Sequence, residues 1–112
     1  MWVFLNDAFL SIVAHAEQPD MLLVRARRAG EIEAVFPGAQ VAHTPRYDYP
    51  YRSMLPRARV AALVMQRLGE IGYPNFKDSV ADADRSHAYM QVWWQMREYQ
   101  RVDKRSRGCD QG

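Results

Sequence analysis

The feature that most constrains this chain is a long amphipathic segment near its C-terminus. Between Ser86 and Val102, large apolar side chains recur every three or four residues. At 3.6 residues per turn they share one face of a helix. Burying so large a stripe requires a sheet or other helices, so we expect the helix to pack on earlier segments, with Trp93 as a core residue. The stripe consists of Tyr89, Val92, Trp93, Met96 and Tyr99.

The first half of the chain contains the segments expected to cover that stripe. Apolar side chains alternate there in the manner of β-strands, and two shorter stretches have helical periodicity. Glycine, proline and acidic residues punctuate the segments at positions where turns and helix ends favour them. We expect strands over residues 8–15, 21–27, 39–44 and 49–55, and helices over residues 31–36, 56–71 and 86–102, the last capped by Asp84 or Ser86.

This order of elements, β-β-α-β-β-α-α, predicts an α+β fold. The sheet should be four-stranded and mostly antiparallel, with helices packed on one face. The chain has 112 residues, enough for one domain with a single core. We therefore predict a single domain over residues 1–102, with Phe76 turned back into its core, and a basic, flexible tail over residues 103–112.

Charge and cysteine content restrict the class of protein further. The formal charge of +2 comes entirely from residues 97–112, where five basic residues stand against three acidic ones. The basic character therefore belongs to the tail, and it supports nucleic-acid binding only weakly. A lone cysteine, Cys109, allows no intrachain disulfide. No segment approaches the roughly 20 apolar residues of a membrane span, and we predict a cytoplasmic protein without a membrane partner.

The sequence contains no motif typical of an enzyme. His15, His43 and His87 do not stand at the spacing of metal ligands, and the single cysteine is remote from them. No nucleophile elbow, glycine-rich phosphate loop or HExxH pair is present. We therefore assign no catalytic residue, no metal and no cofactor.

Arginine on the predicted strands suggests a binding site. Arg25 and Arg27 share the polar face of one strand, and Arg52 interrupts another apolar strand. If these strands pair suitably, the three guanidinium groups line an open sheet face that suits phosphate, carboxylate or an acidic protein. Alternatively, they are ordinary solvent-facing residues paired with acids. The candidate face comprises Arg25, Arg27, Arg52 and Tyr49 or Tyr51, joined by Asn75 and Lys77 if these converge on it.

A second candidate surface lies on the last helix. Met90 and Trp94 stand at i,i+4 spacing and point away from the main stripe. The pair either completes a wide buried face, which we favour, or forms an exposed apolar patch. With Arg97 and Arg101 nearby, an exposed patch would mark a protein–protein contact.

Several segments together resemble a family of small uncharacterised bacterial and phage proteins. The similarity covers residues 2–100 and is most specific in the NFK turn and the tryptophan-bearing helix that follows it. The resemblance implies a single-domain cytoplasmic protein and no particular activity. The segments are FLSIVAH, MLLVRAR, DYPYRSMLP, YPNFKDSV and AYMQVWWQM, and the shared residues are Arg25, Arg27, Tyr49, Arg52, Asn75, Phe76, Lys77 and Trp93.

Three functions are consistent with these features. The leading hypothesis is a small non-enzymatic interaction module that binds a host protein, such as a phage inhibitor of a defence complex of the anti-CRISPR type. The second is a nucleic-acid-binding accessory protein that uses the arginine face and the basic tail. The third is an enzyme on a small anionic metabolite. A second copy of the chain is a further candidate partner.

Overall fold

The computed structural model describes the backbone of residues 1–110 and the side chains of residues 1–103. The chain divides into two compact units, Met1–Pro74 and Asn75–Gly112. This division falls inside the range 1–102 for which a single domain was expected. Each unit is described by itself.

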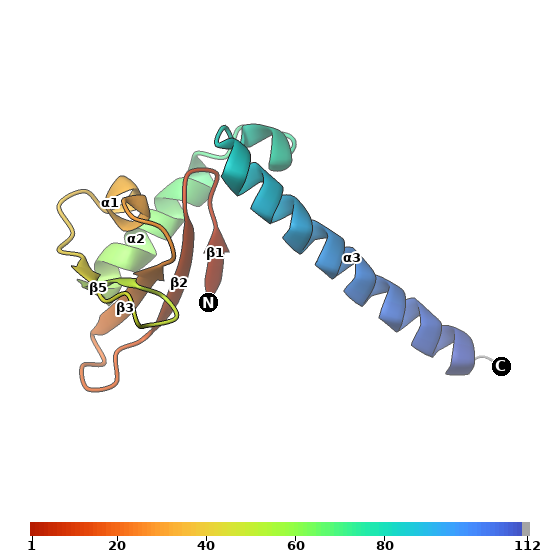
Figure 1. Ribbon diagram of the computed structural model, residues 1–112, viewed down its shortest axis with the longest axis horizontal. Coiled ribbons are helices and arrows are strands. Elements are labelled where there is room, and N and C mark those ends of the chain that lie inside the picture. The colour runs from red at the N-terminus through yellow and green to blue at the C-terminus, as the bar shows by residue number, and fades with distance from the viewer. Residues whose placement is uncertain (111–112) are drawn as a thin grey trace. The chain divides into compact units, whose positions relative to one another are not determined.

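The first unit is built on a five-stranded antiparallel sheet (Figure 1). The strands stand in the order β1-β2-β3-β5-β4, so each hairpin partner is a neighbour in the sheet. The α+β class is confirmed, but the predicted number of four strands is wrong. The strands are β1 (Trp2–Phe4), β2 (Phe9–Ala14), β3 (Met21–Ala26), β4 (Ala42–His43) and β5 (Tyr51–Pro56).

The additional strand is β1, at the apolar start of the chain, where no strand was expected. Three residues are too few to show the alternation that identifies a strand. Pairing with β2 orders the segment, with Trp2 opposite Ser11 and Phe4 opposite Phe9. The N-terminal ammonium group extends this ladder by donating a hydrogen bond of 2.7 Å to the carbonyl of Ile12.

Two helices, α1 (Glu31–Val35) and α2 (Arg57–Gly69), cover one face of this sheet. Gly30 has a φ of 85° immediately before α1, a left-handed conformation that glycine adopts without strain. The helices and the inward residues of β2, β3 and β5 form one hydrophobic core. Its buried members are Ala8, Leu10, Ile12, Val24, Ala26, Ile32, Val35, Phe36, Leu55 and Val60.

The second unit consists of a short 3-10 helix, η1 (Lys77–Ser79), and the long helix α3 (Ala83–Asp110). Asp82 caps α3, because its carboxylate accepts a hydrogen bond of 2.8 Å from the backbone N–H of Arg85. The expected caps, Asp84 and Ser86, are therefore wrong, and the helix begins earlier than its apolar stripe. Phe76 stacks on Tyr89 with ring centroids 5.8 Å apart, and it is not among the residues of the hydrophobic core, into which it was expected to turn.

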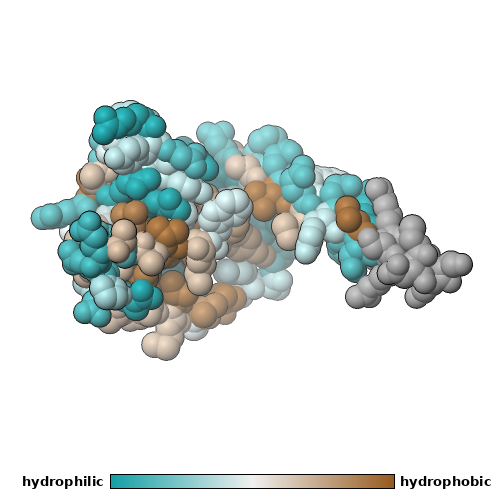
Figure 2. All heavy atoms as spheres, turned by 90° about the horizontal axis from the view of Figure 1, so that it is seen from below, coloured by the Kyte–Doolittle hydropathy of each residue, from teal (hydrophilic) through white to brown (hydrophobic). Residues whose placement is uncertain are grey.

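Most of the apolar stripe of α3 is exposed, contrary to the expectation that it is buried, and only Tyr89 of the stripe is half-buried, where Phe76 stacks on it. Trp93 is 41% exposed, and Met96 and Tyr99 are more exposed still. Figure 2 shows brown, apolar side chains along α3 among hydrophilic ones. The core of the first unit is closed by α1 and α2, and every residue assigned to it precedes Pro74. The prediction of Trp93 as a core residue is therefore wrong.

The helix α3 runs through Asp110, beyond the last apolar residue of the stripe. A flexible tail was expected over residues 103–112. Its side chains, except that of Asp103, lie outside the part of the chain that the structure describes. Within the described residues, no helix combines the length and the apolar character needed to cross a bilayer.

Candidate anion-binding site on the open face of the sheet

Strand register brings two arginines together on the face of the sheet opposite the helices. Because Val24 and Ala26 enter the core, the intervening Arg25 points to the other face. Ser11 on β2 and Arg52 on β5 stand directly opposite Arg25 in the two adjoining ladders. Three neighbouring strands thus contribute one polar row, Ser11–Arg25–Arg52, to the open face.

Two tyrosines in the loop before β5 hold these guanidinium groups. The ring of Tyr49 is buried, with a residue exposure of 5%, and has the guanidinium carbons of Arg25 and Arg27 4.5 and 4.2 Å from its centroid. The guanidinium carbon of Arg52 lies 4.5 Å from the ring centroid of Tyr47. Each contact is of the cation–π type, which orients a guanidinium group without neutralising its charge.

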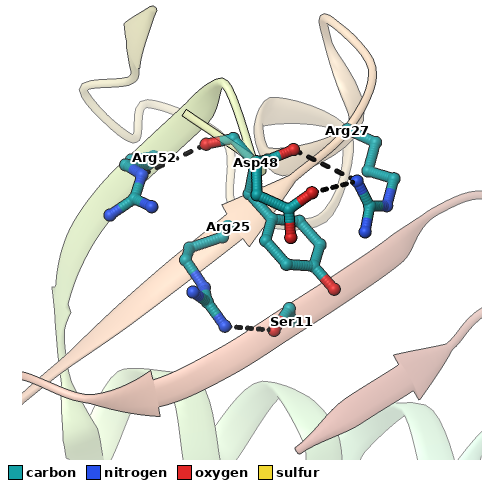
Figure 3. A network of polar contacts seen from close by, with 6 residues as sticks. Ser11, Arg25, Arg27, Asp48 and Arg52 are labelled. Atoms are coloured by element: carbon teal, nitrogen blue, oxygen red, sulfur yellow. Dashed lines mark hydrogen bonds and ion pairs between the residues drawn. The ribbon is translucent and has the colours of Figure 1, made fainter. Parts of the chain in front are cut away.

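Hydrogen bonds fix each arginine further (Figure 3). Arg25 Nη2 donates to Ser11 Oγ at 2.7 Å, and Arg52 Nε donates to the Tyr49 carbonyl at 3.1 Å. Arg27 Nη1 donates to both the carboxylate and the carbonyl of Asp48, at 3.0 and 3.1 Å. The hydrogen bond to Asp48 is the main reason why the pKa of Arg27 is raised.

The charges on this face are incompletely balanced. Arg25 and Arg52 are directly opposite each other on adjacent strands, an arrangement that destabilises an antiparallel pair when the charges are alike. Asp48 pairs with Arg27, and neither Arg25 nor Arg52 forms an ion pair within the described residues. An anion between the two arginines would remove this repulsion.

Hydrogen-bond donors for such an anion are already in place. The two terminal nitrogens of Arg52 have no partner among the described residues. Arg25 Nε also lacks a hydrogen bond among these residues, but this atom is buried and cannot reach an external anion. Guanidinium groups present paired N–H donors that match a carboxylate or a phosphate. The geometry therefore suits an oxyanion carried by a ligand or a partner.

The structure brings together four of the six residues proposed for this face. Arg25, Arg27, Tyr49 and Arg52 converge, whereas the alternative Tyr51 lies on the core side of the sheet and stacks on His43 at 4.5 Å. Asn75 and Lys77 belong to the second unit. There the Asn75 side chain accepts a hydrogen bond of 2.9 Å from the Lys77 N–H, and the Lys77 ammonium lies 5.0 Å from the Trp93 ring centroid.

Three residues of the site were not among the candidates. Ser11 lies within the expected strand over residues 8–15, but its pairing with Arg25 depends on register, which periodicity does not give. Tyr47 and Asp48 precede Tyr49 in a loop, and loop conformation is not readable from periodicity. The signal that was present is the run Tyr47-Asp48-Tyr49, which places two rings and one acid beside the strand that contains Arg52.

The second candidate surface, on α3, is exposed. Trp94 is 46% exposed, so the expectation that it is buried is wrong. Arg97 lies 5.5 Å from the ring centroid of Trp94 and 5.6 Å from that of Trp93. Arg101 forms an ion pair of 3.1 Å with Glu98, and Met90 is half-buried.

Within the described residues, no group of three or more histidine, cysteine, aspartate or glutamate side chains is arranged to hold a metal ion.

Comparisons of the chain with protein-family models, curated proteins and solved structures found no match. The resemblance to small bacterial and phage proteins stays a prediction.

Proposed function

We propose that this protein is a non-enzymatic binding module whose open sheet face recognises an acidic group on a partner protein. The observation that carries the proposal is the cross-strand pair Arg25 and Arg52. Two like charges held side by side cost stability, and the fold maintains them with a buried tyrosine and a buried serine. Such an arrangement is understandable if an oxyanion of the partner occupies the position between them.

The proposal favours a protein partner because of the position of Tyr49. The guanidinium groups of Arg25 and Arg27 pack on its buried ring, so the ring offers no free face on which a nucleobase could stack. Recognition therefore depends on guanidinium donors, which pair well with aspartate and glutamate side chains. Exposed apolar side chains beside the site, Trp2 and Met54, would add contact area at the edge of a protein interface.

A matched pair of double variants tests this proposal. Arg25→Gln/Arg52→Gln removes two charges from the open face, and Arg57→Gln/Arg59→Gln removes two from α2. Arg57 and Arg59 each donate to a backbone carbonyl in the native protein, and both bonds are exposed. The immobilised wild-type protein is used to capture partners from a host lysate, and each captured protein is then purified and its affinity measured directly.

We expect the open-face variant to lose at least tenfold in affinity and the α2 variant to stay within about twofold, because exposed rim charges contribute little. Equal losses in the two variants would show that only net charge matters and would refute the site. Failure to bind any protein, with the wild type folded, would refute the function.

A second candidate function, binding of single-stranded nucleic acid, is favoured by Tyr47. This ring is 43% exposed and lies near both Arg46 and Arg52. Three arginine–phosphate contacts predict a slope of about −2 for the logarithm of affinity against that of salt concentration. Titration with a fluorescent oligonucleotide measures this slope. A steep slope that is abolished by Arg25→Gln/Arg52→Gln would favour nucleic acid over protein as the ligand.

A further inference from the structure

The open face of the sheet carries more positive charge than a single carboxylate neutralises. Asp48 balances Arg27, with which it forms an ion pair of 3.0 Å. The five described strands contain no aspartate or glutamate at all, so the sheet itself offers no acid to Arg25 or Arg52. Both of these charges are therefore left for a ligand to balance.

The accessible donors of the two arginines also exceed what a carboxylate accepts. Hydrogen bonds hold Arg25 through Nη2 and Arg52 through Nε, as Figure 3 shows. Arg25 Nη1 and both terminal nitrogens of Arg52 have no partner among the described residues, and none of these three atoms is buried. Each terminal nitrogen carries two N–H groups, and all of them are available to an anion on this face.

A phosphate monoester matches this surplus better than a carboxylate does. A carboxylate has two oxygens and one negative charge, whereas a phosphate monoester has three acceptor oxygens and a charge of about −1.5 to −2 at pH 7. Arginine pairs with either group through two parallel N–H bonds, and it is the side chain best suited to phosphate. Only the phosphate monoester neutralises both arginines with a single group.

We propose that the open face recognises a phosphorylated side chain of the partner, bound as its phosphate dianion between Arg25 and Arg52. This inference rests on the proposed function and specifies its ligand. Arg52 binds two phosphate oxygens through its terminal nitrogens, and Arg25 binds the third through Nη1. The Ser11 hydroxyl and the Tyr49 carbonyl already orient the two guanidinium groups, so binding orders few additional groups.

The surroundings of the pair favour a polypeptide over the other sources of phosphate. Trp2 stands opposite Ser11 in the same row as Arg25 and is 64% exposed. Met54 follows Arg52 by two residues on β5, so it shares the open face, and it is 42% exposed. These apolar side chains add contact area for a polypeptide that carries the phosphate, but none for free phosphate. A nucleic-acid phosphodiester carries a single charge and leaves one arginine unbalanced.

The second ionisation of the phosphate gives the proposal a pH signature. The second pKa of a phosphate monoester is about 6, so the dianion is lost as pH falls through that value. Affinity should therefore be full at neutral pH and decline in mild acid, whereas a glutamate side chain, with a pKa of about 4.3, keeps its charge.

Other groups near the pair are common to every ligand. Arg27, Arg46, Asp48, Tyr47 and Tyr49 face it from β3 and the loop before β5. The neighbouring strand β4 contributes His43. Protonation of a histidine strengthens the binding of every anion in acid, which is opposite in sign to the effect expected for phosphate. A carboxylate probe therefore controls for it.

Three small probes test the chemistry of the site. They are N-acetyl-O-phosphoserine amide, N-acetylglutamate amide and dimethyl phosphate, each titrated into the full-length protein while backbone amide shifts are followed by NMR. At about pH 7.5 the phosphoserine probe should bind at least tenfold more tightly than either of the others. Its advantage over the glutamate probe should fall about tenfold between pH 7.5 and pH 5, because the dianion is then largely protonated.

Variants of Arg52 assign the binding to the proposed pair. Arg52→Gln should weaken the phosphoserine probe at least tenfold, and Arg52→Lys, which keeps the charge but loses the bidentate donors, should give a smaller loss. The matched control is Arg59→Gln on α2, which covers the other face of the sheet, and it should stay within about twofold. The amide spectrum of each free variant shows whether it keeps the native fold.

A partner captured in the lysate experiment provides the second test. Treatment of that partner with a protein phosphatase should lower its affinity at least tenfold. Unchanged affinity after dephosphorylation, with Arg25→Gln/Arg52→Gln still losing affinity, would overturn the phosphate inference and leave the proposed function standing. Equal binding of the phosphoserine and glutamate probes, or no binding of the phosphoserine probe, would also overturn it. Equal binding of dimethyl phosphate and the phosphoserine probe would point to a nucleic-acid backbone instead.

Discussion

The two units of this protein treat their large apolar side chains in opposite ways. In the first unit, Ile32 and Phe36 are almost completely buried between the sheet and its two covering helices. In the second unit, Trp93, Met96 and Tyr99 lie on a helix and remain largely exposed. The comparison shows that an apolar stripe at helical spacing identifies a helix but does not identify what the helix packs on.

The difference has a physical origin in how each unit is stabilised. Burial of apolar area between layers stabilises the first unit, and this contribution depends on contacts distant in sequence. The helix α3 depends on its own backbone hydrogen bonds, on the Asp82 cap and on local ring contacts such as Phe76 on Tyr89. Perturbations of the two units should therefore have separate effects.

The largest expected effect is on the core of the first unit. Phe36→Ala should lower the free energy of unfolding of that unit by about 3–5 kcal/mol, because the side chain is fully buried and its removal leaves a cavity. Hydrogen exchange should show lost protection in β2 and β3 and unchanged protection in α3. Loss of protection in both units to the same degree would show that they unfold together.

An intermediate effect is expected at the start of α3. Asp82→Ala removes the carboxylate that accepts the Arg85 N–H and should reduce the stability of the helix start by about 1 kcal/mol. Faster hydrogen exchange over residues 83–90, with the first unit unaffected, is the expected result. The matched control is Asp84→Ala, in which an acid of the first turn is removed and the Asp82 cap is retained. A larger effect in the control would show that the helix dipole outweighs the cap.

The smallest effect is expected for the ion pair between Asp7, which precedes β2, and Arg67 of α2. Asp7 accepts a hydrogen bond of 2.8 Å from Arg67, and the Asp7 side chain is 45% exposed. Because solvent screens such a pair, Asp7→Asn should cost less than about 1 kcal/mol of unfolding free energy, and the difference should shrink in high salt. A loss several times larger would show that the pair organises the surrounding loop.

The pH dependence of this pair follows from the pKa of Arg67. The hydrogen bond to Asp7 raises that pKa above its ordinary value. A group whose folded pKa is raised contributes stability at lower pH and loses it only as pH rises through the folded pKa. For arginine this occurs in strongly alkaline solution, so the Arg67 contribution should be constant between pH 6 and 9. Urea denaturation of wild type and Asp7→Asn across that range measures it.

The candidate site was partly readable from the chain. Alternation along β3 placed Arg25 on the face opposite Val24, and this prediction needed only the twofold period of a strand. The pairing of Arg25 with Ser11 and Arg52 depends on strand register, which turns and core packing determine together. The roles of Tyr47 and Asp48 depend on a loop conformation that has no period at all.

Sequence by itself determined the α+β class, the alternating strands Phe9–Ala14 and Met21–Ala26, and the amphipathic character of α3, because each depends on local periodicity. Tertiary structure alone decided that β1 joins the sheet, that Tyr49 rather than Tyr51 stands between arginines, and that Trp93 is exposed. Those outcomes depend on which surfaces meet. The physical reason is that apolar area favours burial without specifying a partner, so the choice is made by register and by the shape of the core that closes first.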